Sequence, residues 1–190
     1  MESAVRHPRL LPAGDMGLVV ELGDGVSLAV NARVRALDRL VAAAAIAGVL
    51  ETQPTNRSLF VLYEPLTIAW PALAARLEAL IARLPEAPEE PAGRAWLIPA
   101  VYGGAFGADL ATAARRLGLR EEELVARHAE RCYRVFMIGF QPGFAYLGEL
   151  DPTLELSRRD EPRPHIPAGT ISIAGAQTLS LIHISEPTRP

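Results

Sequence analysis

The run Gly139 to Gly148 (Gly-Phe-Gln-Pro-Gly-Phe-Ala-Tyr-Leu-Gly) is the densest group of residues that could bind a ligand. Its glycines can adopt backbone conformations closed to other residues and let a ligand approach the main chain. Its aromatic rings, Phe140, Phe144 and Tyr146, offer flat apolar walls. The pattern fits a loop that lines a pocket, and it fits equally a structural turn whose aromatic side chains fill the core.

Arginines on a proline-rich stretch form a second candidate, consisting of Arg158, Arg159 and Arg163. A guanidinium donates two parallel hydrogen bonds to a carboxylate or a phosphate. A loop stiffened by proline also loses less conformational entropy when it binds such a group. The sequence therefore suggests an anionic ligand. A solvated loop whose arginines pair with Asp160 and Glu161 explains the same residues.

Other residues give weaker signals. Asp109 ends a glycine-rich turn before a predicted helix, and it is either a plain N-cap or a residue that positions a ligand at the helix N-terminus. The four histidines lack zinc-ligand spacing, so no metal is predicted. The single cysteine, Cys132, is predicted to be a small buried apolar residue and not a nucleophile.

The elements that must position these residues fall into two groups. In the first, strands are predicted at 17–22, 49–52, 58–63 and 94–101, and helices at 31–47, capped by Asn31, and at 68–84. This order predicts a βαββαβ domain at 1–84 that is closed by the strand at 94–101. Residues 85–93, rich in Pro and Glu, are predicted to be a linker.

In the second group, residues 102–178 are predicted to form a β-rich domain with long functional loops. Its helices are expected at 109–117 and 120–128, and its strands at 133–140 and 170–174. The predicted fold class of the whole chain is α+β.

Composition limits the function. The chain has 190 residues, enough for two small domains, and its net charge is −3 with no basic block, so nucleic acid and anionic membranes are not expected partners. Its longest apolar stretch is too short to span a membrane. One cysteine and a start unlike a signal peptide predict a cytoplasmic protein.

The last twelve residues, 179–190, match the translation of a transposase-type sequencing adapter. We therefore expect them to be non-native and the native sequence to be cut short after Thr178. The alternative is a native terminal strand with His183 as a site residue.

Several motifs in order resemble the family of the 5-oxoprolinase B subunit, which includes allophanate hydrolase subunit 1 and sporulation-kinase inhibitors. The stretches that carry the resemblance are Tyr133 to Leu147, Pro162-Arg163, Ile166 to Thr170, Ile173 to Gly175 and Gln177-Thr178, with Leu18 to Gly23 and Asn31 to Asp38 in the N-terminal half. Ala145 replaces a proline and Asn56 an aromatic residue of the family pattern, which also continues beyond Thr178.

The resemblance implies a ferredoxin-like first domain and an incomplete cyclophilin-like β-barrel as the second. It implies a non-autonomous component that works with a homologous C subunit and an A subunit, in a complex that hydrolyses 5-oxo-L-proline to L-glutamate with ATP and Mg. We expect the chain as written to be inactive. Alternatives within the family are a binding protein that inhibits a histidine kinase and an amidase subunit of the allophanate hydrolase type.

No catalytic residue is assigned. The loops around Gly143, Arg163 and Gly169 are expected to hold the carboxylate of a small anionic substrate or a phosphorylated oxygen. The candidates for binding substrate or nucleotide are Phe140, Pro142, Gly143, Phe144, Tyr146, Arg158, Arg163, Pro167, Gly169 and Gln177. The secondary candidates are Gly104, Phe106, Asp109 and His128.

Overall fold

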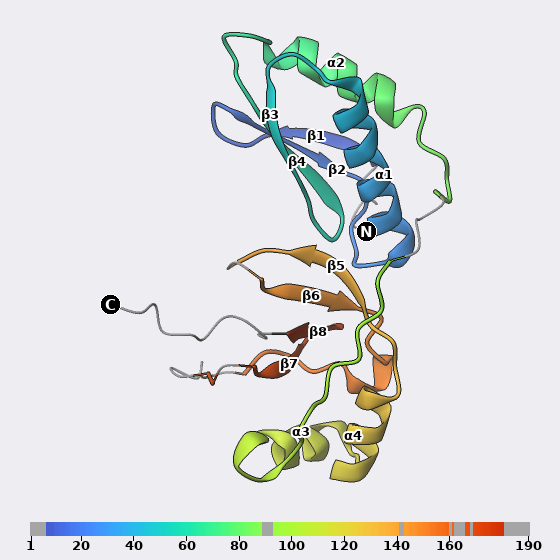
Figure 1. Cartoon of the computed structure of the whole chain (residues 1–190), viewed down its shortest axis with the longest axis vertical. Helices are drawn as coiled ribbons and strands as arrows, with labels where there is room; N and C mark the ends of the chain where they lie inside the picture. Colours follow the sequence, from blue (N-terminus) through green and yellow to red (C-terminus); the bar gives the residue numbers. More distant parts are fainter. Residues whose placement is uncertain are drawn as a thin grey trace, which may run out of the picture. The chain divides into compact units, whose positions relative to one another are not determined.

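The computed structural model describes residues 7–88, 93–140, 143–159, 161, 166–167 and 169–180. The chain divides into two compact units, Met1–Pro91 and Ala92–Pro190, and each contains a four-stranded antiparallel sheet with helices (Figure 1). The predicted α+β class is confirmed. No helix in the described ranges combines the length and apolar character needed to cross a membrane.

The first unit has two strands before its first helix. Its elements are β1 (Arg9–Pro12), β2 (Gly17–Glu21), α1 (Leu28–Ala44), β3 (Val49–Pro54), β4 (Ser58–Tyr63) and α2 (Trp70–Ile81). The strands lie in the order β1-β2-β4-β3. The predicted βαββαβ order is therefore wrong, because the fourth strand is β1 at the start of the chain.

The predicted closing strand at 94–101 is also wrong. These residues form no regular secondary structure and belong to the second unit. Trp96 is 75% exposed and Leu97 is 101% exposed. A strand exists only where a neighbour satisfies its backbone groups, and the position beside β2 that a closing strand could take is filled by β1.

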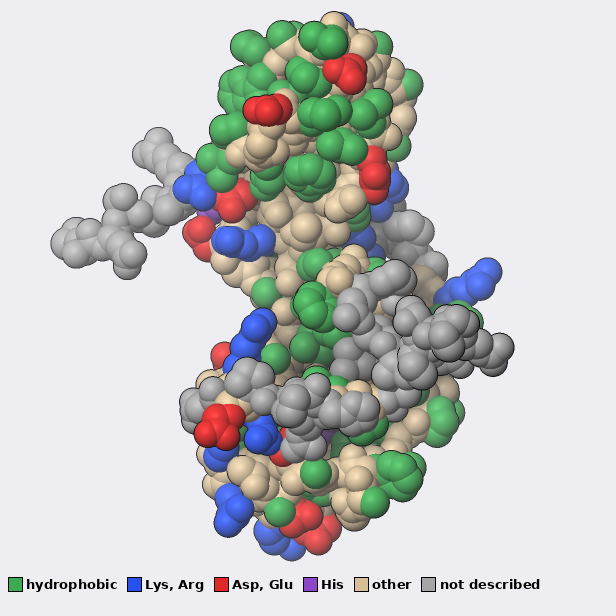
Figure 2. Space-filling view, turned by 90° about the vertical axis from the view of Figure 1, so that its left-hand side faces the viewer, with side chains coloured by type: hydrophobic (Ala, Val, Ile, Leu, Met, Phe, Trp, Pro, Cys, Tyr) green, Lys and Arg blue, Asp and Glu red, His purple; other side chains and the backbone are tan. Residues whose placement is uncertain are grey.

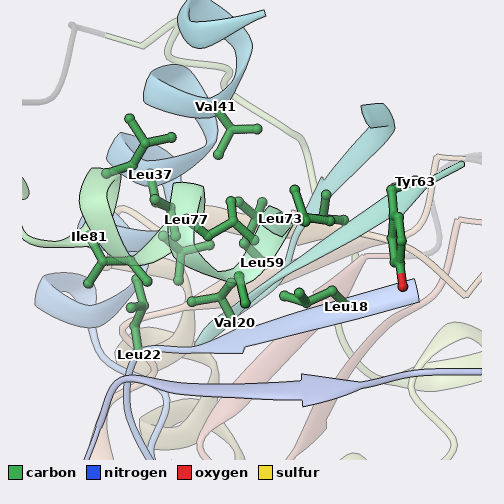
Figure 3. Close-up of a cluster of buried hydrophobic side chains, with 14 residues drawn as sticks. Leu18, Val20, Leu22, Leu37, Val41, Leu59, Tyr63, Leu73, Leu77 and Ile81 are labelled. Carbon is green, nitrogen blue, oxygen red and sulfur yellow. The ribbon is translucent and has the colours of Figure 1, made fainter. Parts of the chain in front are cut away.

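The core of the first unit lies between its sheet and its two helices. Leu18, Val20 and Leu22 alternate along one chain segment and point toward Leu37 on α1 and Leu77 on α2 (Figure 3). Fourteen buried residues make up this cluster. The period-two pattern of the strands and the helical spacing of α1 and α2 thus place apolar side chains on facing surfaces.

The start of α1 differs from the prediction. Ser27 is the N-cap, and its Oγ accepts a hydrogen bond from the Val30 amide at 3.2 Å. Asn31, predicted as the cap, is fully buried in the first turn, where its side-chain amide donates to the Thr55 carbonyl at 3.0 Å. Asn31 therefore ties α1 to the turn between β3 and β4.

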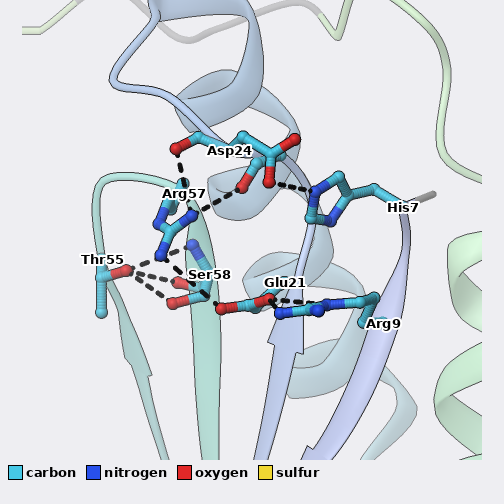
Figure 4. A network of polar contacts seen from close by, with 8 residues as sticks. His7, Arg9, Glu21, Asp24, Thr55, Arg57 and Ser58 are labelled. Atoms are coloured by element: carbon cyan, nitrogen blue, oxygen red, sulfur yellow. Dashed lines mark hydrogen bonds and ion pairs between the residues drawn. The ribbon is translucent and has the colours of Figure 1, made fainter. Parts of the chain in front are cut away.

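A polar network joins the ends of β1, β2 and β4 (Figure 4). Glu21 on β2 receives a hydrogen bond from Arg9 Nε at 3.0 Å and lies 3.7 Å from Arg57 Nη2. Arg57 Nη1 also donates to the Asp24 carbonyl at 3.0 Å, and the Asp24 carboxylate lies 2.8 Å from His7 Nε2. These contacts link neighbouring strands at one end of the sheet. Because the arginines are partly exposed, the contacts add little stability.

The second unit places two helices beside an open sheet. Its elements are η1 (Gly104–Phe106), α3 (Leu110–Leu117), α4 (Glu121–Ala129), β5 (Arg134–Ile138), β6 (Ala145–Gly148), η2 (Pro152–Leu154), β7 (Ile171–Ala174) and β8 (Gln177–Ser180). The strand order is β5-β6-β8-β7. The last described strand, β8, therefore lies inside the sheet, between β6 and β7.

The buried cluster of the second unit is small. It consists of Ala114, Leu124, Leu150 and Leu154, with partly buried neighbours around it. Figure 2 shows arginine and acidic side chains of this unit close to one another, so the face in view carries no broad patch of one sign.

Candidate functional site

The glycine- and aromatic-rich run forms the loop between β5 and β6. The amide of Gly139 donates to the Phe144 carbonyl at 3.1 Å and closes the loop. Gly143 has a φ of +80°, a conformation that favours glycine. Two loop residues, Gln141 and the candidate Pro142, lie outside the described residues. The loop is thus a hairpin tip held by a short backbone closure.

The aromatic side chains of this run are in sequential contact. The ring centroids of Phe140 and Phe144 are 5.6 Å apart, and those of Phe144 and Tyr146 are 4.8 Å apart. Phe144 is only 6% exposed, whereas Phe140 is 81% exposed. The interpretation as a core-filling turn therefore describes Phe144, which fills the interior. The interpretation as a ligand-binding loop describes Phe140, which presents a ring at the surface.

Phe140 also has an unusual backbone conformation. Its φ of +69° is rarely adopted by a bulky side chain and costs energy. Burial of the ring does not compensate for this strain, because the Phe140 ring is exposed to solvent. Strained and exposed positions of this kind cluster at binding sites, so Phe140 is the strongest ligand-contact candidate of the loop.

The arginine stretch has a different partner from the one expected. Arg159 Nη1 lies 2.6 Å from Asp109 Oδ1, and Arg159 Nε donates to the Glu161 backbone carbonyl at 3.3 Å. Arg158 is exposed. Asp160 and the candidate Arg163 lie outside the described residues. The observed ion pair connects the loop to the start of α3, and both of its side chains are about half exposed.

The N-cap position, one of the two roles predicted for Asp109, is confirmed, although the hydrogen bond of a capping side chain is missing. Asp109 occupies the N-cap position of α3, but its φ of −100° and ψ of −6° are helical and its side chain makes no cap hydrogen bond. Its carboxylate instead turns toward Arg159. Two other secondary candidates lie just upstream, in the single 3-10 turn η1: Gly104 has a φ of +55°, and the Phe106 side chain is exposed.

The remaining primary candidates lie around the β7–β8 hairpin. Gly169 has a φ of +72°, with open space where a side chain would project. Exposed Pro167 accepts a hydrogen bond through its carbonyl from Thr170 Oγ1 at 2.6 Å. Gln177 begins β8 opposite Ala174 of β7. A compact turn at Gly169 thus leads into the hairpin whose second strand begins at Gln177.

His128 lies on the buried side of α4 and contacts β8. It is 6% exposed. Its Nδ1 lies 2.7 Å from the Tyr102 hydroxyl, and its Nε2 lies 3.0 Å from Thr178 Oγ1. The Tyr133 ring lies 5.2 Å from the imidazole, and its hydroxyl donates to the His128 carbonyl at 2.8 Å.

The contacts of His128 with Tyr102, Tyr133 and Thr178 were not predicted from the sequence. Twenty-six residues separate Tyr102 from His128, and fifty separate His128 from Thr178. No local spacing could signal such a group. The prediction that Cys132 is buried is wrong: it is exposed, in the segment between α4 and β5.

A shallow hollow of about 400 Å³ opens beside Tyr102. Its lining residues are Tyr102, Gly103, Leu110, Glu121, Glu122, Val125 and Ala126. The aromatic loop and the arginine stretch do not contribute to it. Its two carboxylates would repel an anion.

The starts of α3 and α4 do not fit ATP. A magnesium-bound triphosphate keeps a net negative charge and needs N–H donors or cations. The first turn of α4 carries Glu121, Glu122 and Glu123, and the N-terminus of α3 carries Asp109, so both helix starts are acidic. We therefore derive no chemical step through ATP on this chain.

The chain thus folds into two α+β units, the second with a loop-rich open sheet. The family model described as "Carboxyltransferase domain, subdomain C and D" matches residues 8–186, and the chain belongs to this family. The resemblance seen in the sequence is thereby confirmed.

Two similar proteins are both named as B subunits of 5-oxoprolinase. The chain is 41% identical over 178 residues to the 5-oxoprolinase B subunit of Escherichia coli O157:H7, covering 92% of this chain and 78% of that protein. It is 34% identical over 175 residues to the 5-oxoprolinase B subunit of Bacillus subtilis, covering 87% and 72%. The chain is thus homologous to the B subunit of 5-oxoprolinase.

A solved structure supports the same placement. The crystal structure of TTHA0988 matches with a TM-score of 0.71 and 36% identity, covering 87% of this chain. The match covers 32% of the TTHA0988 chain, so this chain spans about a third of it.

Proposed function

We propose that the chain is the B subunit of an ATP-dependent 5-oxoprolinase that hydrolyses 5-oxo-L-proline to L-glutamate together with the A and C subunits. The observation that carries the proposal is the 41% identity, over 92% of this chain, to a protein named as the B subunit of 5-oxoprolinase. A match of that extent includes residues from both units.

The candidate loops suit a small cyclic amide with a carboxylate. The exposed Phe140 ring provides an apolar surface for the five-membered lactam. Gly143 and Gly169 both have a positive φ, and we propose that backbone N–H groups at these turns donate to a carboxylate or carbonyl oxygen. Arg163 is the proposed partner of the carboxylate, on the basis of its motif.

The chemistry requires a partner. In the net reaction, a water oxygen bonds to the lactam carbonyl carbon, the ring C–N bond breaks, and the released nitrogen takes up a proton. An unstrained amide is a poor electrophile, and hydrolysis of ATP elsewhere in the complex would supply the driving force. The acidic helix starts described above support the proposal that another subunit holds ATP.

The test is an activity measurement on the complex. The full-length chain is co-expressed with the A and C subunits, and glutamate formation from 5-oxo-L-proline is followed. We expect Arg163→Ala to raise KM at least about tenfold, since a charged hydrogen bond to the substrate is lost. Arg76→Ala, which changes an exposed arginine on α2, is the matched control and should leave KM unchanged.

Two results would count against the proposal at different points. Unchanged KM and kcat in Arg163→Ala would remove Arg163 from the site and leave the proposed role of the chain in the complex standing. Full activity of the A and C subunits without this chain would remove that role itself.

A further inference from the structure

Three segments of the second unit meet at His128. The imidazole projects from α4, Tyr102 comes from the segment before η1, and Thr178 comes from β8. Thr178 is 1% exposed, so its contact with His128 is shielded from water. The proposed reaction uses none of these three side chains.

The direction of each hydrogen bond follows from the Ser172 carbonyl, which ends this series of contacts. Thr178 Oγ1 lies 3.1 Å from the Ser172 carbonyl, and a carbonyl oxygen can only accept. The threonine hydrogen is therefore given to Ser172, and Thr178 Oγ1 must accept from His128 Nε2–H. A neutral imidazole then has a lone pair on Nδ1, which accepts from the Tyr102 hydroxyl.

Protonation of His128 disturbs this arrangement. An imidazolium carries a hydrogen on Nδ1 as well, so the Tyr102 hydroxyl must turn from donor to acceptor and its own hydrogen loses the imidazole as a partner. The positive charge would also lie in a ring that is only 6% exposed. Burial also lowers the pKa of His128 below its ordinary value of 6.5, because the charged ring would lose its water. Both effects favour the neutral ring.

The titratable groups that face the imidazole are the phenols of Tyr102 and Tyr133. Burial raises the pKa of both, that of Tyr133 to about 12, so neither phenol supplies a negative charge near neutral pH. From the β7–β8 hairpin the imidazole meets the uncharged Thr178 hydroxyl. The nearby pair Arg131–Asp151, 3.6 Å apart, acts on the pKa of Tyr133 with opposite signs.

We propose that Tyr102, His128 and Thr178 form an acid-sensitive latch that holds the β7–β8 hairpin on α4, closed while the imidazole is neutral and released when it is protonated. The hairpin follows the turn at Gly169 and begins its second strand with Gln177. Release would therefore loosen those two candidate ligand contacts. That consequence rests on the proposed function, whereas the latch itself does not.

The sign of the pH dependence follows from linkage. Above pH 6.5 the imidazole is neutral in both the latched and the released state, and the latch contributes fully. As the pH falls below 6.5, the imidazole binds a proton in the released state but not in the latched state. The equilibrium constant for latching therefore falls by up to about tenfold per pH unit, until the lower pKa of the latched form is reached.

The first test uses the intact chain labelled with ¹⁵N. Long-range ¹H–¹⁵N correlation spectra should show His128 as the Nε2–H tautomer at pH 8. Hydrogen exchange between pH 8 and pH 5, expressed as protection relative to intrinsic rates, should show the amides of β7 and β8 losing at least fivefold protection below pH 6.5. The amides of β2 and β4 in the first unit provide the internal reference.

Variants separate the latch from general acid sensitivity. His128→Gln keeps a side-chain donor and cannot titrate, so the pH dependence of hairpin protection should disappear. Tyr133→Phe removes only the bond to the His128 backbone carbonyl and should keep that dependence. An Nδ1–H tautomer, or wild-type protection that is flat from pH 8 to 5, would overturn the proposal, as would pH dependence retained in His128→Gln. The wild-type spectra decide the question even if a variant does not fold.

Discussion

Phe140 and Phe144 are neighbours in space but lie in different environments. Their rings are in contact, but one is at the surface with a strained backbone and the other is buried under the β5–β6 hairpin. A motif that places aromatic residues four apart in a loop cannot tell these environments apart. The structure assigns the structural role to Phe144 and leaves Phe140 available for a ligand.

This difference gives a prediction about stability. Phe144→Ala should lower the free energy of unfolding of the second unit by about 3 kcal/mol, since a buried aromatic ring is lost. Phe140→Ala should change it by less than about 0.5 kcal/mol, because the ring is exposed. Urea unfolding followed by circular dichroism measures both. Equal losses in the two variants would show that Phe140 is part of the core.

The candidate site was predictable only where its residues are adjacent in sequence. The loop from Gly139 to Gly148 can be recognised in the sequence, because its glycines and aromatic residues lie within ten positions. The Arg159–Asp109 pair spans fifty residues, and so does the contact between His128 and Thr178. Such pairs are created by the tertiary fold, so the ion pair of Arg159 with Asp109 could not be read from the residues next to Arg159 in sequence.

At the level of elements, strands with a clear alternating pattern were predicted well. β4 has the predicted bounds, Ser58 to Tyr63, and buries every second residue. β1, β6 and β8 were missed, although β7, which is equally short, was predicted; these three runs become strands through pairing with a neighbour. The segment 94–101 was predicted as a strand for the opposite reason, since it has the apolar composition of a strand and lacks the pairing.

The start of α1 offers a test at this scale. Ser27→Ala should lower the free energy of unfolding of the first unit by about 1 kcal/mol through loss of the cap, and Ser27→Asp should recover most of it. Thermal and urea unfolding provide the measurement.

Asn31→Ala serves as the comparison for Ser27→Ala. It removes a buried donor from the Thr55 carbonyl and should cost about 1–3 kcal/mol. If Ser27→Ala were neutral and Ser27→Asp had no effect, the helix would not depend on this cap.

At the scale of the whole molecule, the two units differ in how much apolar surface they bury. Among the residues that the structure describes, the main cluster of the first unit contains fourteen buried residues, and that of the second contains four. The second unit also exposes large apolar side chains at Trp96, Leu97 and Val101. Burial of apolar surface is the main favourable term in folding, so the units should differ in stability.

We therefore expect two unfolding transitions, with the second unit melting at the lower temperature or urea concentration. Calorimetry measures the number of transitions, and hydrogen exchange assigns each to a unit through the amides of β4 and β6. The hydrophobic dye ANS should bind to the intact chain through the exposed apolar segment of the second unit. A single cooperative transition that includes both sheets would contradict this expectation.

The inner position of β8 also affects how the protein is made. The first unit has all its strands and helices once Ile81 has left the ribosome, and it can fold while synthesis continues. The second sheet cannot close until Ser180 emerges, because β7 reaches β6 only through β8. At a synthesis rate of about 5–20 residues per second, the β5–β6 hairpin waits on the order of seconds for its neighbour. During that interval its apolar face is open to chaperones and to other nascent chains.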